Sequence, residues 1–309
     1  MLSHRSAMTL TSLPLIVSLA TLALVGASPL LADPPKDWTL TFSDEFAGDT
    51  LDPAKWGTTM AFMGTHGPRY HNEYYSSYTV DDDVIVADGS LRLRTDRRTV
   101  AGRNEKPGTF HFTQGLVSTH DKFAFTHGYI EIRARFPVGK GLWPCFWLMA
   151  QHQTWPPEFD VAEYYGGQRK MHFGLAHGTL DDIRWDSSGD TNMEAVCDWH
   201  TYALEWMPGR AVWSVDGIPR KTIKAEYVPS TPMYVVLSNS VSSALGPSGA
   251  PDADTVFPNY FEIDYVRVYK APAAGAVEAV LARNDSPAKE APAVEPIAAP
   301  PVTAPAPMP

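Results

Sequence analysis

The sequence predicts an all-β protein that folds as one antiparallel sandwich or jelly roll. Short segments of alternating polar and apolar residues recur from Trp38 to Tyr269, and Gly, Pro, Asn and Asp separate them. Helical periodicity is scarce over the same stretch. With 309 residues, of which 44% are hydrophobic, the chain can bury one substantial core or two small ones.

The expected strands can be followed along the chain. Residues 38–42, 90–94, 129–136 and 211–215 each alternate apolar and polar side chains, which is typical of a strand with one buried face. The dipeptides at 88–89 and 216–217 are both Asp-Gly, lie between such segments and predict tight turns. We therefore expect the folded domain to span residues 33–270.

The two ends of the chain differ from this middle part. Residues 1–32 contain an apolar run from about Leu10 to Leu24, with reasonable cleavage points after Ala27 and Ala32. This pattern predicts a secretory signal peptide and a protein secreted to the extracellular space or the periplasm. The alternative is an uncleaved anchor, because the uncharged run is nearly long enough to span a bilayer.

Residues 271–309 are rich in Pro and Ala and predict a disordered tail. Apart from the N-terminal run, no stretch could cross a membrane, so we expect no membrane association after signal cleavage.

Charge and cysteine content narrow the choice of partners. The formal net charge of −10 disfavours nucleic acid, because phosphate binding requires a basic surface. A neutral polysaccharide suits an acidic chain with 11% aromatic residues, although acidity can also serve solubility alone. The two cysteines, Cys145 and Cys197, could pair in an exported protein, and the sequence leaves this disulfide open. We expect a monomer.

The most informative stretch is residues 155–164, which read WPPEFDVAEY. In a regular strand Glu158 and Asp160 share one face, whereas Glu163 falls on the opposite parity. One extra residue, a β-bulge near Val161–Ala162, would return Glu163 to the side of the other two acids. The stretch therefore predicts three carboxylates above a groove.

Clustered carboxylates repel each other, so holding them together costs stability unless function offsets the cost. Glycoside hydrolysis requires two acids that flank the scissile bond, and a pair about 5–5.5 Å apart serves the retaining reaction. The alternatives are a calcium site and a solvated edge strand. A calcium loop more usually carries Asx residues and a Gly-bearing turn, and an exposed strand would not place Phe, Val and Ala among its acids. We therefore expect catalysis at this strand.

Four further segments accompany the acid strand. They are residues 44–46 (DEF), 139–148 (GKGLWPCFWL), 200–206 (HTYALEW) and 261–269 (FEIDYVRVY). Together with the acid strand, which matches the bulged signature Glu-x-Asp-x-x-Glu, their order resembles glycoside hydrolase family 16 over about residues 38–270. The resemblance implies a β-jelly-roll of two curved antiparallel sheets with an open concave cleft.

The resemblance also implies a reaction and the residues that perform it. Glu158 would be the nucleophile, Glu163 the acid/base, and Asp160 the partner that tunes and orients Glu158. These roles describe a retaining endo-β-glycanase that works by double displacement and needs no cofactor for catalysis.

The expected substrate is β-1,3-glucan or mixed β-1,3/1,4-glucan, because the bulged signature is more frequent among enzymes that act on β-1,3-glucans. The alternatives are a bacterial exopolysaccharide, a galactan, transglycosylation, and a non-catalytic glucan-binding protein. Relatives of the last kind typically lose the catalytic glutamates, which this chain retains. Cys145 stands where the family usually has Ala, and such departures leave the particular glycan open.

Several side chains are candidates for binding the substrate. Trp143 and Trp147 share a strand face with Cys145 between them, and Trp155 precedes the acid strand. All three tryptophans could offer flat faces to sugar rings, or some could fill the core instead. By resemblance Asn72 reaches the sugar, and the alternative is that it caps a turn.

Two further expectations rest on the resemblance alone. His177 would lie near the acid/base, with His172 as a rival in a different register. Glu45, the Gly89 carbonyl and Asp264 match a structural calcium site far from the chemistry, and their oxygen ligands suit a hard cation.

Overall fold

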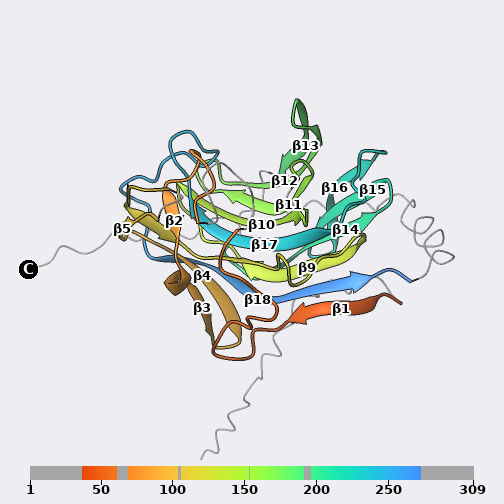
Figure 1. The fold of residues 1–309 in the computed structure, drawn as a ribbon, viewed down its shortest axis with the longest axis horizontal. Coiled ribbons are helices and arrows are strands. Elements are labelled where there is room, and N and C mark those ends of the chain that lie inside the picture. The colour runs from red at the N-terminus through yellow and green to blue at the C-terminus, as the bar shows by residue number, and fades with distance from the viewer. Residues whose placement is uncertain (1–36, 61–68, 104–105, 153, 191–195, 273–309) are drawn as a thin grey trace, which may run out of the picture. The chain divides into compact units, whose positions relative to one another are not determined.

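Two sheets packed face to face make up the fold in the computed structural model (Figure 1). The structure describes residues 37–60, 69–103, 106–152, 154–190 and 196–272. The expected signal peptide (1–32) and all but the first two residues of the expected tail (271–309) lie outside these ranges. The only helix within them is the 3-10 helix η1 (Asp81–Asp83), and none is long and apolar enough to cross a membrane.

The larger sheet has ten strands and is antiparallel except for one parallel pair, β2 with β7. β1 pairs with β18 and β3 pairs with β4 at the sides of its main path. Along that path the order is β16 (Ile218–Lys224), β15 (Arg210–Val215), β14 (His200–Met207), β9 (Gly128–Arg135), β18 (Asn259–Lys270), β4 (Ser90–Asp96), β7 (Phe112–Gln114) and β2 (Ser77–Thr79), and the two side strands are β1 (Thr39–Asp44) and β3 (Val84–Ala87).

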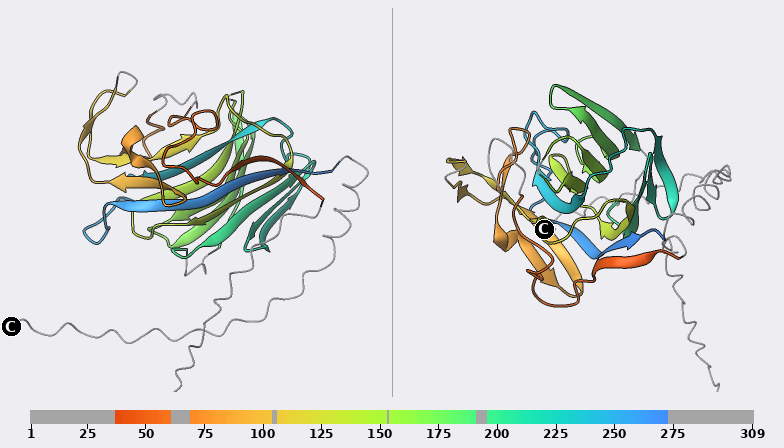
Figure 2. Two further views of the ribbon diagram at one scale, coloured as in Figure 1. Left: turned by 90° about the horizontal axis from the view of Figure 1, so that it is seen from below. Right: turned by 45° about the vertical axis from the view of Figure 1, so that its right-hand side comes forward.

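The smaller sheet has six antiparallel strands, and its middle strands carry the acids. A separate two-stranded ribbon joins β5 (Val100–Ala101) to β6 (Thr109–Phe110). The order of the six-stranded sheet is β13 (Asp182–Asp190), β12 (Lys170–Thr179), β11 (Glu158–Tyr165), β10 (Leu142–Ala150), β17 (Met233–Val241) and β8 (Leu116–Ser118). Figure 2 shows the same two layers from two further directions.

The structure confirms the expected all-β class and the expected turns. The segments predicted as strands lie in β1, β4, β9 and β15. Asp88 and Gly89 have φ values of 53° and 71°, and Asp216 and Gly217 have 50° and 74°. Positive φ at both central residues is the geometry of a type I′ turn, which matches the twist of the strands that it joins. These dipeptides connect β3 to β4 and β15 to β16.

The core lies between the two sheets and draws on both. Phe159 of β11 contacts Trp206 and Trp213 of the larger sheet, with ring centroids 5.4 and 5.7 Å away. Burying an aromatic side chain of this kind stabilises the fold by about 2–3 kcal/mol. Phe146 and Leu148 of β10 belong to the same core cluster. Because side chains alternate along a strand, the residues between them point away from the core, toward the site described below.

Candidate active site

A bulge in β11 brings the three acids to one face. In the pairing of β11 with β10, Val161 has no partner, since Asp160 and Ala162 lie opposite successive residues of β10. The pairing with β12 shifts between Asp160 and Glu163. The predicted bulge is therefore confirmed, and Glu158, Asp160 and Glu163 all line one cleft.

Glu163 is surrounded by hydrogen-bond donors and is only 7% exposed. Trp143 donates its indole N–H to Glu163 Oε1 at 3.0 Å, and the Cys145 thiol approaches the same oxygen at 3.4 Å. The Tyr165 hydroxyl donates to Oε2 at 3.0 Å, and His172 Nδ1 lies 3.8 Å from that oxygen. These neighbours hold the Glu163 carboxyl in a defined orientation.

Glu158 receives a hydrogen bond from the Trp155 indole N–H, which lies 2.6 Å from its Oε2. Burial raises the pKa of Glu158 to about 7, and the charge of Glu163 adds to this effect. Hydrogen bonds from Asp160 and Trp155 act in the opposite direction, because they stabilise the ionised carboxylate. Glu158 is therefore a carboxyl group that titrates near neutrality.

Asp160 lies between the two glutamates and is only 2% exposed. Burial, followed by the charges of Glu163 and Glu158, raises the pKa of Asp160 well above its usual range. Its side chain forms hydrogen bonds with both glutamates. Burial and the neighbouring acids thus favour the protonated form of Asp160, which can donate a hydrogen bond to the Glu158 carboxylate.

The backbone of β11 is also fixed from the far side of the core. Trp213 of β15 donates its indole N–H to the Asp160 carbonyl oxygen at 2.9 Å. This carbonyl lies where the bulge disturbs the strand pairing. The larger sheet therefore supports the catalytic strand at its irregular point.

Aromatic side chains line the cleft, which has a volume of about 570 Å³. Trp143 and Trp147 from β10 and Trp155 before β11 are among its lining residues. Tyr75 stacks on Trp143, with ring centroids 4.7 Å apart and an interplanar angle of 26°. Flat rings beside carboxylates suit a sugar, because they can contact the apolar C–H faces of a pyranose ring.

Asn72 also lines this cleft. At the same time it caps a turn, which was the alternative role considered above. Its side-chain oxygen accepts a hydrogen bond from the Tyr74 backbone N–H at 3.0 Å, which is the pattern of an Asx turn. The turn occupies the amide oxygen of Asn72 and leaves the side-chain NH₂ as the group that can reach a ligand.

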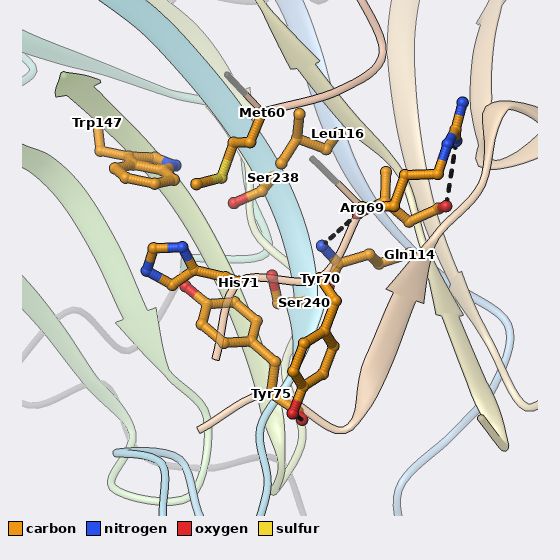
Figure 3. Close-up of a pocket in the computed structure, with 11 residues that line it drawn as sticks. Met60, Arg69, Tyr70, His71, Tyr75, Gln114, Leu116, Trp147, Ser238 and Ser240 are labelled. Atoms are coloured by element: carbon orange, nitrogen blue, oxygen red, sulfur yellow. Dashed lines mark hydrogen bonds between the residues drawn. The ribbon is translucent and has the colours of Figure 1, made fainter. Parts of the chain in front are cut away.

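A small cavity of about 10 Å³ lies beside the cleft, on the same face of the six-stranded sheet (Figure 3). Trp147 and Ser240 line it, and the Trp147 Nε1 and Ser240 Oγ atoms are buried without a hydrogen-bond partner among the described residues. Figure 3 also shows Arg69 and Gln114, which donate to Thr79 at 3.2 and 3.0 Å. A space of this size can hold one water molecule.

Comparison with known proteins agrees with this geometry. The family model described as glycosyl hydrolases family 16 matches residues 71–266, which include the bulged strand and the cleft floor. The chain belongs to glycosyl hydrolase family 16.

Individual relatives resemble this family 16 chain over most of its length. It is 28% identical to a beta-glucanase of Rhodothermus marinus, with 80% of this chain and 91% of that protein covered. It is 27% identical to the endo-1,3-1,4-beta-glycanase EglC of Rhizobium meliloti (strain 1021), over 76% of this chain. The chain spans only 52% of the length of that relative.

Solved structures give the same picture of the fold. The X-ray structure of an endo-beta-1,3-glucanase from Pyrococcus furiosus matches with a TM-score of 0.65 and 28% sequence identity. The match covers 75% of this chain and 94% of that chain.

The structure corrects the expectation for His177. β12 pairs Glu163 with His172, so His172 shares the cleft face and the odd-numbered His177 points to the opposite face. His177 is absent from the cleft lining among the described residues, and its ring stacks on Tyr227 at 3.9 Å. Within this family 16 chain, His172 is therefore the histidine near Glu163.

The side chains expected to bind calcium are engaged elsewhere. Glu45 forms a two-point ion pair with Arg267, with contacts of 2.9 and 2.7 Å. Asp264 is paired with Arg133 at 2.7 Å. The described residues also contain no group of three or more His, Cys, Asp or Glu side chains arranged to hold a metal. Because arginines neutralise both carboxylates, this donor set does not fit a calcium ion as it is arranged.

The two cysteines are both free: Cys145 is buried in the cleft floor and Cys197 is exposed. Burial raises the pKa of the Cys145 thiol well above its usual range, so it acts as a neutral donor toward Glu163.

Six cleft residues were not predicted from the sequence: His71, Tyr74, Tyr75, Tyr165, Trp185 and Ser187. Tyr165 lies two residues beyond Glu163 on the same face, so its parity could have revealed it. Trp185 lies on β13, and no motif marks its strand. His71 and Tyr75 enter the cleft from a loop, and only tertiary packing determines that position.

Proposed function

We propose that this family 16 chain is a retaining endo-β-glucanase that cleaves β-1,3-glucan or mixed β-1,3/1,4-glucan. One observation carries the proposal: the bulge at Val161 places Glu158 and Glu163 in one aromatic-lined cleft, with Asp160 between them. The names of the relatives in Rhodothermus marinus, Rhizobium meliloti and Pyrococcus furiosus support this class of substrate.

In the first proposed step, the Glu158 carboxylate attacks the anomeric carbon and forms a covalent glycosyl-enzyme. Glu163 gives its proton to the departing glycosidic oxygen. Asp160, which keeps its proton, donates a hydrogen bond that orients Glu158 and stabilises its charged form.

In the second step, Glu163 takes a proton from a water molecule, and that water attacks the anomeric carbon and displaces the Glu158 carboxylate from it. Two inversions at the same carbon give net retention. The hydrogen bonds from Trp143 and Tyr165 keep the Glu163 carboxyl in position for both proton transfers. Two carboxyl groups complete this chemistry, so we propose that no cofactor takes part.

We further propose that the chain is exported and acts as a monomer. The apolar run within residues 1–32 supports export, and N-terminal sequencing of the secreted protein would test it. Light scattering of the purified protein would test the monomer.

The activity can be tested by measuring reducing ends released from laminarin, lichenan, agarose and a bacterial exopolysaccharide. We expect release from laminarin, lichenan or both. Glu158→Gln and Glu163→Gln should each lower the rate by about 10²–10⁴-fold or more, because each removes a group that acts in the transition state. Glu226→Gln, a change at an exposed glutamate outside the cleft, is the matched control and should keep the wild-type rate.

Two results would count against the proposal. If the wild-type chain bound a glucan but released no reducing ends from it, the chain would be a binding protein. If either glutamine variant kept a near-native rate and a native melting temperature, the assignment of the acids would be wrong.

A further inference from the structure

The hairpin formed by β12 and β13 lies at one edge of the six-stranded sheet and projects beyond the neighbouring strands (Figure 1). Trp185 of β13 pairs with Ala176 of β12, and Ala176 in turn pairs with Glu158. Trp185 and Glu158 therefore belong to one row across the sheet, separated by two strand spacings, or roughly 10 Å. Side chains of a row point to the same face, and Trp185 does line the cleft.

Only small residues of β12 lie between Trp185 and the acids. Ala176 and Gly174 are the cleft-facing positions of β12 between them. At Gly174 a Cβ atom would come within 2.7 Å of the Asp160 carboxyl oxygen, so a side chain there would disturb the acids. Glu158 and the Trp185 indole therefore line the cleft with no large side chain of β12 between them.

Trp185 is unusual for a tryptophan because 48% of its surface is exposed. Its nearest aromatic neighbour is Trp155, with ring centroids 6.4 Å apart, and Trp155 is the residue that donates to Glu158. Single exposed apolar residues are ordinary on protein surfaces. A large ring that faces a cleft beside a second ring is instead typical of a ligand site.

The opposite face of the hairpin is tied to the larger sheet. Asp186, next to Trp185, accepts hydrogen bonds from the Lys221 ammonium at 2.6 Å and from the Tyr227 hydroxyl at 2.8 Å. The His177 ring stacks flat on Tyr227, with an interplanar angle of 10°. We call Asp186, Lys221, Tyr227 and His177 the hairpin clamp. The clamp limits movement of β13 and so holds the indole of Trp185 toward the cleft.

We propose that Trp185 is a sugar-binding platform that extends the substrate site beyond the catalytic strand on the β13 side. It takes the apolar face of a pyranose ring in a neutral glycan chain. The hairpin clamp consists of positioning residues that hold the platform in place. This inference rests on the proposed function, because the platform binds a further unit of the chain that Glu158 and Glu163 cleave.

The test uses the full chain and laminari-oligosaccharides of increasing length, from the trisaccharide to the heptasaccharide. For Trp185→Ala, the ratio of its KM to the wild-type KM should rise with chain length to about tenfold, while kcat stays near the wild-type value. Trp185→Phe should recover most of the loss, because it restores an apolar ring. Ile218→Ala, a change at an exposed apolar residue of β16, is the control and should match the wild type for every length.

The clamp is tested with Tyr227→Phe, which removes the hydroxyl donor to Asp186 and keeps the ring beside His177. We expect the same dependence on chain length as for Trp185→Ala, but with a smaller, several-fold increase in KM. If Tyr227→Phe behaves like the wild type, the hairpin clamp does not position Trp185. The platform is then tested by the Trp185 variants alone.

The platform would be overturned if wild type and Trp185→Ala had equal KM values at every length. It would also be overturned if the variant raised KM by the same factor at every length. Calorimetric binding of the heptasaccharide separates this inference from the proposed function. If the wild-type chain binds it without cleaving it, the activity fails, and a tenfold weaker binding by Trp185→Ala still supports the platform. If the wild-type chain does not bind it, both proposals fail.

Discussion

At the scale of single residues, the site is a set of three carboxyl groups that share a limited number of protons. Burial beside two other acids favours the protonated form of Asp160, and Glu158 loses its proton near neutral pH. The macroscopic titration belongs to the group as a whole. A nucleophile must be ionised, so activity should fall as the pH drops through the pKa of Glu158, which is about 7.

We predict that Asp160→Ala moves the acid limb of the kcat/KM profile to higher pH, by on the order of one pH unit. The hydrogen bond from Asp160 lowers the pKa of Glu158, and its loss removes that stabilisation of the carboxylate. Asp160→Asn should shift the limb less, because an amide N–H can still donate. The measurement is kcat/KM on laminarin between pH 5 and 9. A limb that moves to lower pH in Asp160→Ala would contradict the direction of this coupling.

The sequence was sufficient to predict the acids and insufficient to predict the groups that hold them. Glu158, Asp160 and Glu163 are close in sequence, so their parity can be examined directly. Tyr75, which stacks on Trp143, is distant from β10 in sequence. Its position depends on the path of a loop across the sheet, for which no local pattern exists.

At the scale of elements, the bulge in β11 decides which face Glu163 occupies. Two successive residues, Val161 and Ala162, both belong to the core cluster, which a regular strand cannot achieve. The parity of the acids predicted this irregularity. The parity of β12 could not be predicted in the same way, because His172 and His177 have opposite parities and only the pairing with β11 decides between them.

We predict that deletion of Val161 lowers stability but keeps all three acids on the cleft face. Without Val161 the spacing becomes Glu-x-Asp-x-Glu, so a regular strand carries the acids on one face, while the core loses one buried side chain. Val161→Ala provides the comparison, because it keeps the residue count. It should cost about 1–3 kcal/mol for the lost buried methyl groups and retain turnover under conditions where it is folded.

Urea unfolding and laminarin hydrolysis measure the two effects. A folded deletion variant that loses as much turnover as Glu163→Gln would contradict this parity argument. If the deletion variant does not fold, Val161→Ala still tests the separation of stability from catalysis.

At the scale of the whole molecule, the two sheets depend on each other for the geometry of the site. The indole of Trp213 crosses the core from the larger sheet and donates to the Asp160 carbonyl at 2.9 Å. The ring itself is fully buried and packs beside Phe159. The sandwich class could be predicted from the alternation of polar and apolar residues alone. The contact between Trp213 and Asp160 could not, because it depends on how the two sheets are placed against each other.

We predict that Trp213→Phe lowers the free energy of unfolding by about 2–4 kcal/mol. The change leaves a buried carbonyl without its donor and creates a small cavity. It should also lower kcat by more than it raises KM, because the backbone that carries Asp160 and Glu158 loses a support. Trp206→Phe offers a matched control, since its indole N–H instead donates to the Pro229 carbonyl, away from the acids. Equal effects of both changes on kcat would argue against a specific role for Trp213.

The pairing of β1 with β18 has a consequence for the way the domain is connected. The first strand (red in Figure 1) lies beside the last strand (blue), and Thr39 pairs with Lys270. Paired residues in antiparallel strands have Cα atoms only about 5 Å apart. A short linker could therefore join residues 39 and 270, and new ends could be opened at the Asp216–Gly217 turn. Such a circular permutant would keep every strand around the acids continuous, since both changes fall on the sheet that lacks them.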